Sequence, residues 1–304
     1  MPALASPAAR LLVDWLNERW STSFAIAEEA GETAVASDGE HRLAVYAAPL
    51  WEDDAAWDER LRATESRLGE ADGPLLLWVP PQAGVPSEEP AASDFVERVR
   101  AIAATLEPGA RAEVTFPVTV RMVKTRDEGG YASVMGGLSR WWTRITENVQ
   151  GTYQVDSSDV HRLTHDGDVR EQLWETIGRL SHGVELGKGV EFEVEEAWTL
   201  QRLRDGEPGY VLAGAPPGSD PTEGIAVRRT VRRRLQAANE ALAGVEADLR
   251  AVALVGAYEY GELETAGATV KAVDPSLFSR FEVVCVLADG DVRPTFLPRA
   301  LPWV

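Results

Sequence analysis

The stretch GETAVASDGEHRLAVYAAPLW, residues 31–51, decides how the beginning of the chain folds. Its runs 33–36 and 42–48 are short and β-type, and the Asp38–Gly39 pair between them is a strong signal for a tight turn. A further β-type run, residues 24–27, precedes this hairpin. The sequence therefore predicts three consecutive strands.

Helical patterns lie on both sides of these strands. Residues 8–20 carry leucines and tryptophans on one face at helical spacing, with polar residues opposite. Asp53 or Asp54 can cap a second helix after the strands. Residues 74–79, PLLLWV, are apolar on both alternating faces and predict a fully buried strand. The predicted order is α-β-β-β-α-β.

The last part of the chain has the same predicted order. Asp168 and Glu171 have capping-box spacing at the start of a helix, and three strand-like runs follow it. A long helix over 221–243 and a buried strand over 251–257 complete the pattern. We therefore expect an α/β (α+β) protein of two lobes with mixed sheets. The repeated order has two alternative explanations, an old internal duplication or chance. The strand-like runs are 190–194, 198–203 and 210–215.

The composition excludes several classes of protein. The 304 residues include 49 acidic and 30 basic side chains, which give a net charge of −19. Such a charge repels phosphate and anionic lipid, so nucleic acid and membranes are disfavoured as partners. One cysteine, Cys285, cannot form an internal disulfide, and its apolar surroundings predict a core residue. No apolar run approaches the roughly 18 residues of a membrane-spanning helix. We expect a cytoplasmic globular protein.

The charge is distributed unevenly along the chain. Residues 1–110 and 151–304 each carry a large acidic excess, whereas residues 111–150 carry a small basic excess. This distribution predicts an N-terminal acidic α/β lobe, a basic β-hairpin connector that contains tryptophan, and a C-terminal α/β lobe.

The basic connector is the first candidate binding region. Arginine beside flat aromatic side chains is typical of surfaces that bind single-stranded nucleic acid or another anionic ligand. Alternatively, the tryptophans pack between the lobes while the arginines pair with acidic neighbours. The candidate residues are Arg121, Lys124, Arg126, Arg140, Trp141, Trp142 and Arg144.

The helix predicted over 221–243 is the second candidate. An apolar stripe on one side leaves four arginines on the opposite face, in the half where the helix dipole disfavours positive charge. A bound anion, another subunit or the acidic run 191–196 could face them. That run, EFEVEE, is also typical of a strand with one solvent-exposed face. The arginines are Arg228, Arg229, Arg232 and Arg233.

His161 and His165, with Asp166 beside them, are the candidate metal ligands. On a helix, histidines four residues apart share a face and could bind Zn²⁺ with a carboxylate. The segment is also rich in turn-forming residues, so the alternative is a polar loop that leads into a capped helix.

The predicted element order resembles the core of the PD-(D/E)XK, or restriction-endonuclease-like, nucleases. In that family the second strand carries an acid and the third carries an acid, a spacer and a lysine, which together bind a divalent metal. Residues 31–51 are similar to that hairpin in length and spacing, but Tyr46-Ala47-Ala48 stands where the acid and lysine should be. The second lobe has Leu212-Ala213-Gly214 at the comparable place. The resemblance implies a fold relative without the nuclease site.

These observations favour a non-enzymatic binding or assembly protein that acts through the basic, aromatic connector and the arginine face. No catalytic residue and no cofactor is predicted, and a protein partner or a homo-oligomer is favoured over nucleic acid. The alternatives are a divergent metal-dependent nuclease or hydrolase, which would use Zn or Mg, and an acidic DNA mimic that inhibits a nucleic-acid-binding partner.

Overall fold

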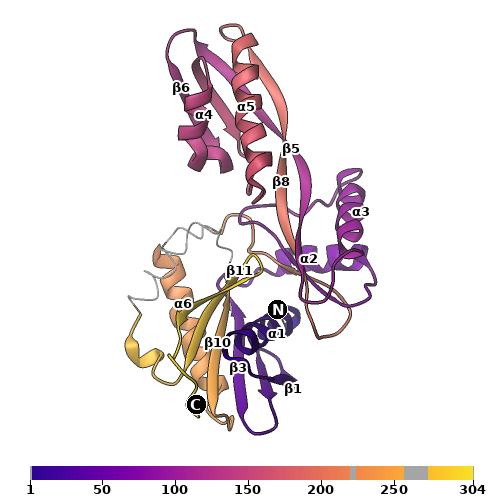
Figure 1. Ribbon diagram of the computed structural model, residues 1–304, viewed down its shortest axis with the longest axis vertical. Coiled ribbons are helices and arrows are strands. Elements are labelled where there is room, and N and C mark those ends of the chain that lie inside the picture. Colours follow the sequence, from indigo (N-terminus) through magenta and orange to yellow (C-terminus); the bar gives the residue numbers. More distant parts are fainter. Residues whose placement is uncertain (1, 220–223, 257–272, 304) are drawn as a thin grey trace. The chain divides into compact units, whose positions relative to one another are not determined.

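The computed structural model describes residues 2–219, 224–256 and 273–303 (Figure 1). The chain divides into two compact units. Residues 1–112 and 199–304 form the first, here called the terminal unit, and residues 113–198 form the second, the central unit. These units differ from the three segments expected from charge. Residues 113–150 share a unit with residues 151–198, because their strands pair in one sheet.

The terminal unit contains a six-stranded mixed sheet. Its order is β1-β2-β3-β10-β11-β12, with a parallel centre of β3, β10 and β11 and antiparallel strands at both ends. The predicted strands and the turn at 38–39 are confirmed. The bounds are β1 Ala25–Ala30, β2 Thr33–Ser37, β3 Arg42–Pro49, β10 Leu249–Val255, β11 Val283–Ala288 and β12 Asp291–Phe296.

One helix covers each face of this sheet. Helix α1 (Pro2–Trp20) packs on the face that carries Ala47, and α6 (Gly224–Ala241) packs on the face that carries Tyr46. Successive residues of a strand point to opposite faces, so the apolar run of β3 supplies both cores. The apolar stripe predicted for the helix over 221–243 is also confirmed, since Val231 and Leu235 of α6 are buried against the sheet.

The α-β-β-β order at the start of the chain is completed by α6 and β10, which pairs in parallel with β3. Strand β4 (Pro74–Trp78), expected to complete the first lobe, lies in another sheet. There it pairs antiparallel with β8 (Gly189–Arg202) and in parallel with β9 (Gly209–Ala213). The α/β class with mixed sheets is therefore confirmed, but an internal duplication is not.

Helix α2 (Ala55–Leu68) covers the outer edge of β9. The Trp57 indole donates a hydrogen bond to the Gly214 carbonyl over 2.8 Å, and the Glu65 carboxylate accepts one from the Leu212 N–H over 2.8 Å. These bonds satisfy backbone groups that an edge strand otherwise leaves unpaired. Helix α3 (Ala91–Ala103) completes the unit.

The central unit has the strand order β6-β7-β5-β8. Strand β7 lies between β5 and β6, antiparallel to the first and parallel to the second. At Gly136 a Cβ would lie 2.2 Å from the Ser157 carbonyl oxygen, and at Gly137 it would lie 1.9 Å from that of Val160. The glycine pair is thus required for close packing of the backbone. The bounds are β5 Arg111–Arg126, β6 Gly130–Gly136, η1 Gly137–Trp141, α4 Trp142–Asn148, β7 Gly151–Ser157 and α5 Gly167–Gly183.

Helices α4 and α5 cover one face of the central sheet. Met122 and Tyr153 of the sheet pack there against Ile145 and Trp174 of the helices. The other face of the sheet is open. Along β7, buried positions on the helix side alternate with partly or fully exposed positions on this other side. Within the described ranges, no helix is long and apolar enough to span a membrane.

Two local predictions are corrected. Asp166, not Asp168, caps α5, because its carboxylate accepts the N–H groups of residues 168 and 169. The runs 190–194 and 198–203 belong to one long strand, β8.

Candidate functional site

The basic residues of β5 do not form a free cationic surface. Arg121 is exposed on the open face of the sheet, opposite Asp156 of β7. Hydrogen bonds from Ser158, together with the charge of Arg121, lower the pKa of Asp156. The Lys124 ammonium is largely buried and lies 3.1 Å from Asp127. Arg126 is exposed at the end of β5.

The two adjacent tryptophans have different environments. Trp141 packs against Trp174 of α5, with 5.7 Å between ring centroids, and the Arg170 guanidinium lies 5.4 Å from the Trp141 ring. Trp141 therefore packs within the central unit. Trp142 is 49% exposed. Arg140 is exposed, and Arg144 lies 3.5 Å from Glu171 and 3.8 Å from Glu147.

The central arginines lie on two sides of the sheet. Met122 points into the core beneath α4, so its neighbour Arg121 points to the open face. Arg144 belongs to α4 itself. The structure thus does not bring the residues predicted at 121–144 together on one surface.

The four arginines predicted on the helix face belong to α6 in the terminal unit, and all four are exposed: Arg228, Arg229, Arg232 and Arg233. Arg233 lies 3.4 Å from Glu52. The pKa of Asp274 is lowered first by the Ser276 N–H and hydroxyl and further by the charge of Arg232. Intramolecular pairing, the plainer of the predicted explanations, accounts for part of this face.

Arg234 of α6, which is not among the predicted residues, makes several contacts with the chain around the end of β3. Its guanidinium donates to the Pro49 carbonyl over 2.9 Å and the Trp51 carbonyl over 3.3 Å. Asp53 lies 3.3 Å and Glu32 3.7 Å from it. The signal that could have found it is its place in the helical repeat, beside the apolar stripe rather than opposite it.

Glu32 also accepts a hydrogen bond of 2.7 Å from the Tyr46 hydroxyl. Burial, and then this bond, raise the pKa of Tyr46. Ala47 and Ala48, which stand where the resemblance would place a spacer and a lysine, are buried. The cluster around Tyr46 ties α6 to the end of β3 through polar contacts.

The two candidate metal-ligating histidines pair with different carboxylates. His161 Nδ1 lies 2.9 Å from Glu196, which also accepts the Trp198 indole N–H over 2.6 Å. His165 Nδ1 lies 2.8 Å from Glu113. Asp166 caps α5. In the described part of the chain, no group of three or more His, Cys, Asp or Glu side chains is arranged to hold a metal ion.

The Glu113 carboxylate, which contacts this loop from β5, has a strongly lowered pKa. Burial by itself raises its pKa, but hydrogen bonds from the His165 ring, the Thr164 hydroxyl and the His165 N–H lower it to about 2. Arg162, whose guanidinium lies 3.3 Å away, contributes in the same direction. The ionised Glu113 carboxylate therefore holds the loop before α5 in position by accepting these hydrogen bonds.

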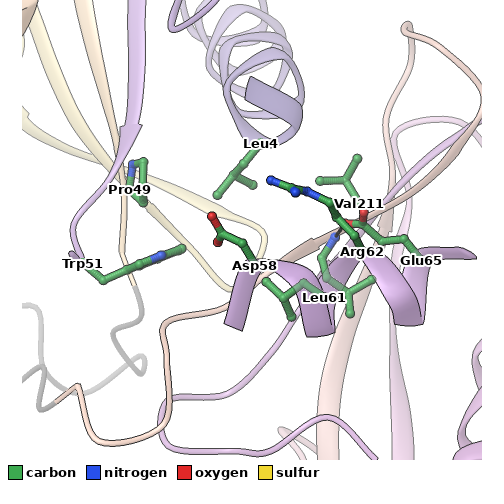
Figure 2. Close-up of a pocket in the computed structure, with 9 residues that line it drawn as sticks. Leu4, Pro49, Trp51, Asp58, Leu61, Arg62, Glu65 and Val211 are labelled. Atoms are coloured by element: carbon green, nitrogen blue, oxygen red, sulfur yellow. Dashed lines mark hydrogen bonds between the residues drawn. The ribbon is translucent and has the colours of Figure 1, made fainter. Parts of the chain in front are cut away.

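A small pocket lies in the terminal unit (Figure 2). Leu4 of α1, the chain after β3 at Trp51, and α2 residues including Asp58 and Glu65 surround a space of about 50 Å³. This volume holds a few water molecules. Because Glu65 is already bonded to Leu212, its part in this pocket is structural.

A larger groove lies in the central unit between β8 and α5, and we call it the β8–α5 groove. Its volume is about 180 Å³, and Leu163 and Thr164 are among the residues that line it. Val169 is 40% exposed and Leu173 is half-buried, so apolar surface is open to solvent. The walls are formed by Val169, Arg170, Gln172, Leu173 and Thr176 of α5 and by Glu193, Val194 and Glu195 of β8.

No known protein family, curated protein or solved structure matches this chain.

Proposed function

We propose that this chain is a non-enzymatic binding protein that contacts a protein partner through its central unit. One observation carries the proposal. Of the six large hydrophobic side chains exposed in the described residues, five lie in the central unit, which is less than a third of the chain. They are Tyr131, Met135, Trp142, Val169 and Leu186, and the sixth is Phe296 in the terminal unit.

Exposed apolar side chains point to protein rather than to phosphate as the partner. Their burial on association is favourable, and aromatic residues and Met are enriched at protein interfaces. The cations of the same unit are partly neutralised, as in the Lys124–Asp127 and Arg144–Glu171 pairs. The net charge of −19 further opposes attraction to nucleic acid.

Selection of peptides on the whole chain tests this proposal. A random peptide library displayed on phage is selected on the immobilised protein, and fluorescence anisotropy then gives the affinity of each synthesised peptide. We expect the affinity to fall by about tenfold or more when the five central residues are changed together to serine. The matched control is Phe296→Ser, which removes an exposed apolar side chain from the other unit and should leave the affinity unchanged. Circular dichroism confirms that both variants are folded.

Three kinds of result would contradict the proposal. The first is a library that yields no binding peptide, and the second is a set of peptides that bind the five-residue variant as tightly as the natural chain. The third is stoichiometric Zn²⁺ in the purified protein, or salt-sensitive binding of a single-stranded oligonucleotide, which would favour an enzyme or a nucleic-acid-binding protein instead.

A further inference from the structure

Strand β8 has an open edge within the central unit. On one side it pairs with β5. On the other side, the Ala197 N–H donates to the Arg162 carbonyl over 3.0 Å, and Leu163 forms a bridge with Glu196. Among the described residues of this unit, no further pairing covers this side of β8, and the β8–α5 groove runs along it.

The direction of the free backbone groups follows from the Ala197 bond. In a strand, the N–H and C=O of alternate residues point to the same side. Glu193 and Glu195 therefore direct their N–H and C=O groups to the same side of β8 as Ala197 does. The bridge between Leu163 and Glu196 places the Glu195 C=O beside the Thr164 N–H, so the open groups are both those of Glu193 and the N–H of Glu195. Both residues are exposed.

The outer edge of β9, in the same chain, is covered by a helix. There, side chains of α2 bond to the edge at Leu212 and Gly214. Natural proteins cover or bond such edges, since an unpaired edge invites another strand. The β8 edge lacks such a cover in the described structure. The helix wall beside it carries the apolar Val169 and Leu173 next to polar side chains.

The chemistry on the two faces of β8 differs. Phe192 and Val194 point toward the helix layer and pack on the core. Glu191, Glu193 and Glu195 alternate with them and point to the open face of the sheet. A strand added at this edge would therefore meet the apolar side chains of Val169 and Leu173 on one face and three carboxylates on the other.

We infer that the β8–α5 groove binds an extended peptide in which basic and apolar side chains alternate, and that the peptide adds to β8 as a further strand. The inference rests on the proposed function and specifies the partner and its site. The apolar side chains pack on Val169 and Leu173, and the basic ones lie opposite Glu193 and Glu195. Backbone hydrogen bonds to both groups of residue 193 and to the N–H of residue 195 supply the register.

Fluorescence anisotropy with synthetic peptides on the whole chain tests the inference. The probe is a peptide of about eight residues that alternates Val and Arg. Its controls have the same composition in two blocks, Glu in place of Arg, or N-methyl groups on alternate residues, which remove strand hydrogen bonds and keep the side chains. We expect each control to bind about tenfold more weakly or worse.

Two variants of the chain locate the site. Glu193→Pro removes one N–H on the open side of an edge strand, where proline is tolerated, and should weaken binding about tenfold. Glu193→Gln with Glu195→Gln keeps the edge and should reduce the salt dependence of binding. Glu147→Gln, which neutralises an exposed carboxylate on α4, is the matched control and should bind as the natural chain does.

Failure of the Val-Arg peptide to bind, or equal binding of its N-methylated form, would overturn the inference without using any variant. Equal binding by a folded Glu193→Pro chain would do the same. If library-selected peptides still bind that variant, the central unit remains a protein-binding unit and only the groove is excluded as the site. Loss of the selected peptides on the five-residue variant is thus a separate result.

Discussion

The carboxylate of Glu65 on α2 accepts a hydrogen bond of 2.8 Å from the backbone N–H of Leu212 on β9. A side chain thereby replaces the strand that would otherwise pair with this edge. Burial raises the pKa of Glu65, although the Leu212 bond and the Arg62 charge lower it. The bond closes the sheet edge while the carboxylate loses part of its hydration.

Substitution of Glu65 is expected to separate these two effects. Glu65→Gln keeps an acceptor for Leu212 and removes the buried charge, so the free energy of unfolding at neutral pH should stay equal or rise. Glu65→Met leaves the Leu212 N–H unsatisfied and should cost about 1–3 kcal/mol. Urea denaturation of both variants measures the difference, and equal stability of the two would contradict the role of the bond.

The pH dependence of Glu65 provides a further check. A carboxyl whose pKa is raised on folding stabilises the protein below its unfolded pKa, and this contribution is lost as the pH rises through the folded value. The natural chain should therefore lose stability relative to Glu65→Gln as the pH rises from 4.5. A constant difference between the two proteins across this range would contradict the prediction.

Glu113 is expected to act in the opposite direction. Its pKa is lowered from 4.5 to about 2, so its stabilising contribution is present above pH 4.5 and is lost as the pH falls toward 2. Glu113→Gln should be less stable than the natural chain at neutral pH, by about 1–3 kcal/mol, and the difference should shrink in acid. Urea denaturation at several pH values measures it, with the exposed Glu147→Gln as control. A difference that does not change with pH would contradict the assignment.

The adjacent tryptophans should respond differently to truncation. Trp141→Ala removes the contact with Trp174 and should cost about 2 kcal/mol of unfolding free energy. Trp142→Ala changes a half-exposed ring and should alter stability by about 0.5 kcal/mol or less. Thermal and urea denaturation compare the two variants. Equal losses would show that the central unit packs differently.

Local patterns account for the elements that the sequence predicted correctly. The strands around the Asp38–Gly39 turn and the Asp54 cap of α2 depend on neighbouring residues, and both are present. The partner of β3 could not be predicted in this way, since Ala47 lies beside Ala253, far away in the sequence. Periodicity shows which faces of a strand are apolar, but it does not specify which strand lies next to it.

The candidate sites show the same limit. Arg121 and Arg144 are close in sequence. Arg121 belongs to strand β5 and points to the open face of the sheet, whereas Arg144 belongs to helix α4, which covers the opposite face. The β8–α5 groove was missed because an open edge is a property of the whole sheet. The one indication in the local sequence was the alternation of apolar and acidic residues in FEVEE, which predicted a strand with one solvent-exposed face.

Cys285 is expected to be unreactive in the folded protein. The side chain is fully buried in β11, and burial raises the pKa of the thiol to about 12. The thiolate is the reactive form, so a thiol reagent such as DTNB should not modify the native chain at neutral pH and should modify one thiol per chain in denaturant. Rapid modification without denaturant would contradict the burial of β11.

Neighbouring arginines of α6 offer the sharpest comparison. The Arg234 side chain is 11% exposed and donates to the carbonyls of Pro49 and Trp51, so Arg234→Ala should cost about 2 kcal/mol of unfolding free energy. Arg233 is 50% exposed, and its contact with Glu52 is at the surface, so Arg233→Ala should change stability by about 0.5 kcal/mol or less. Both variants lose one positive charge, so the difference in their urea denaturation isolates the contacts at the end of β3. If both changes were equally small, the Arg234 contacts would not hold α6 to that strand.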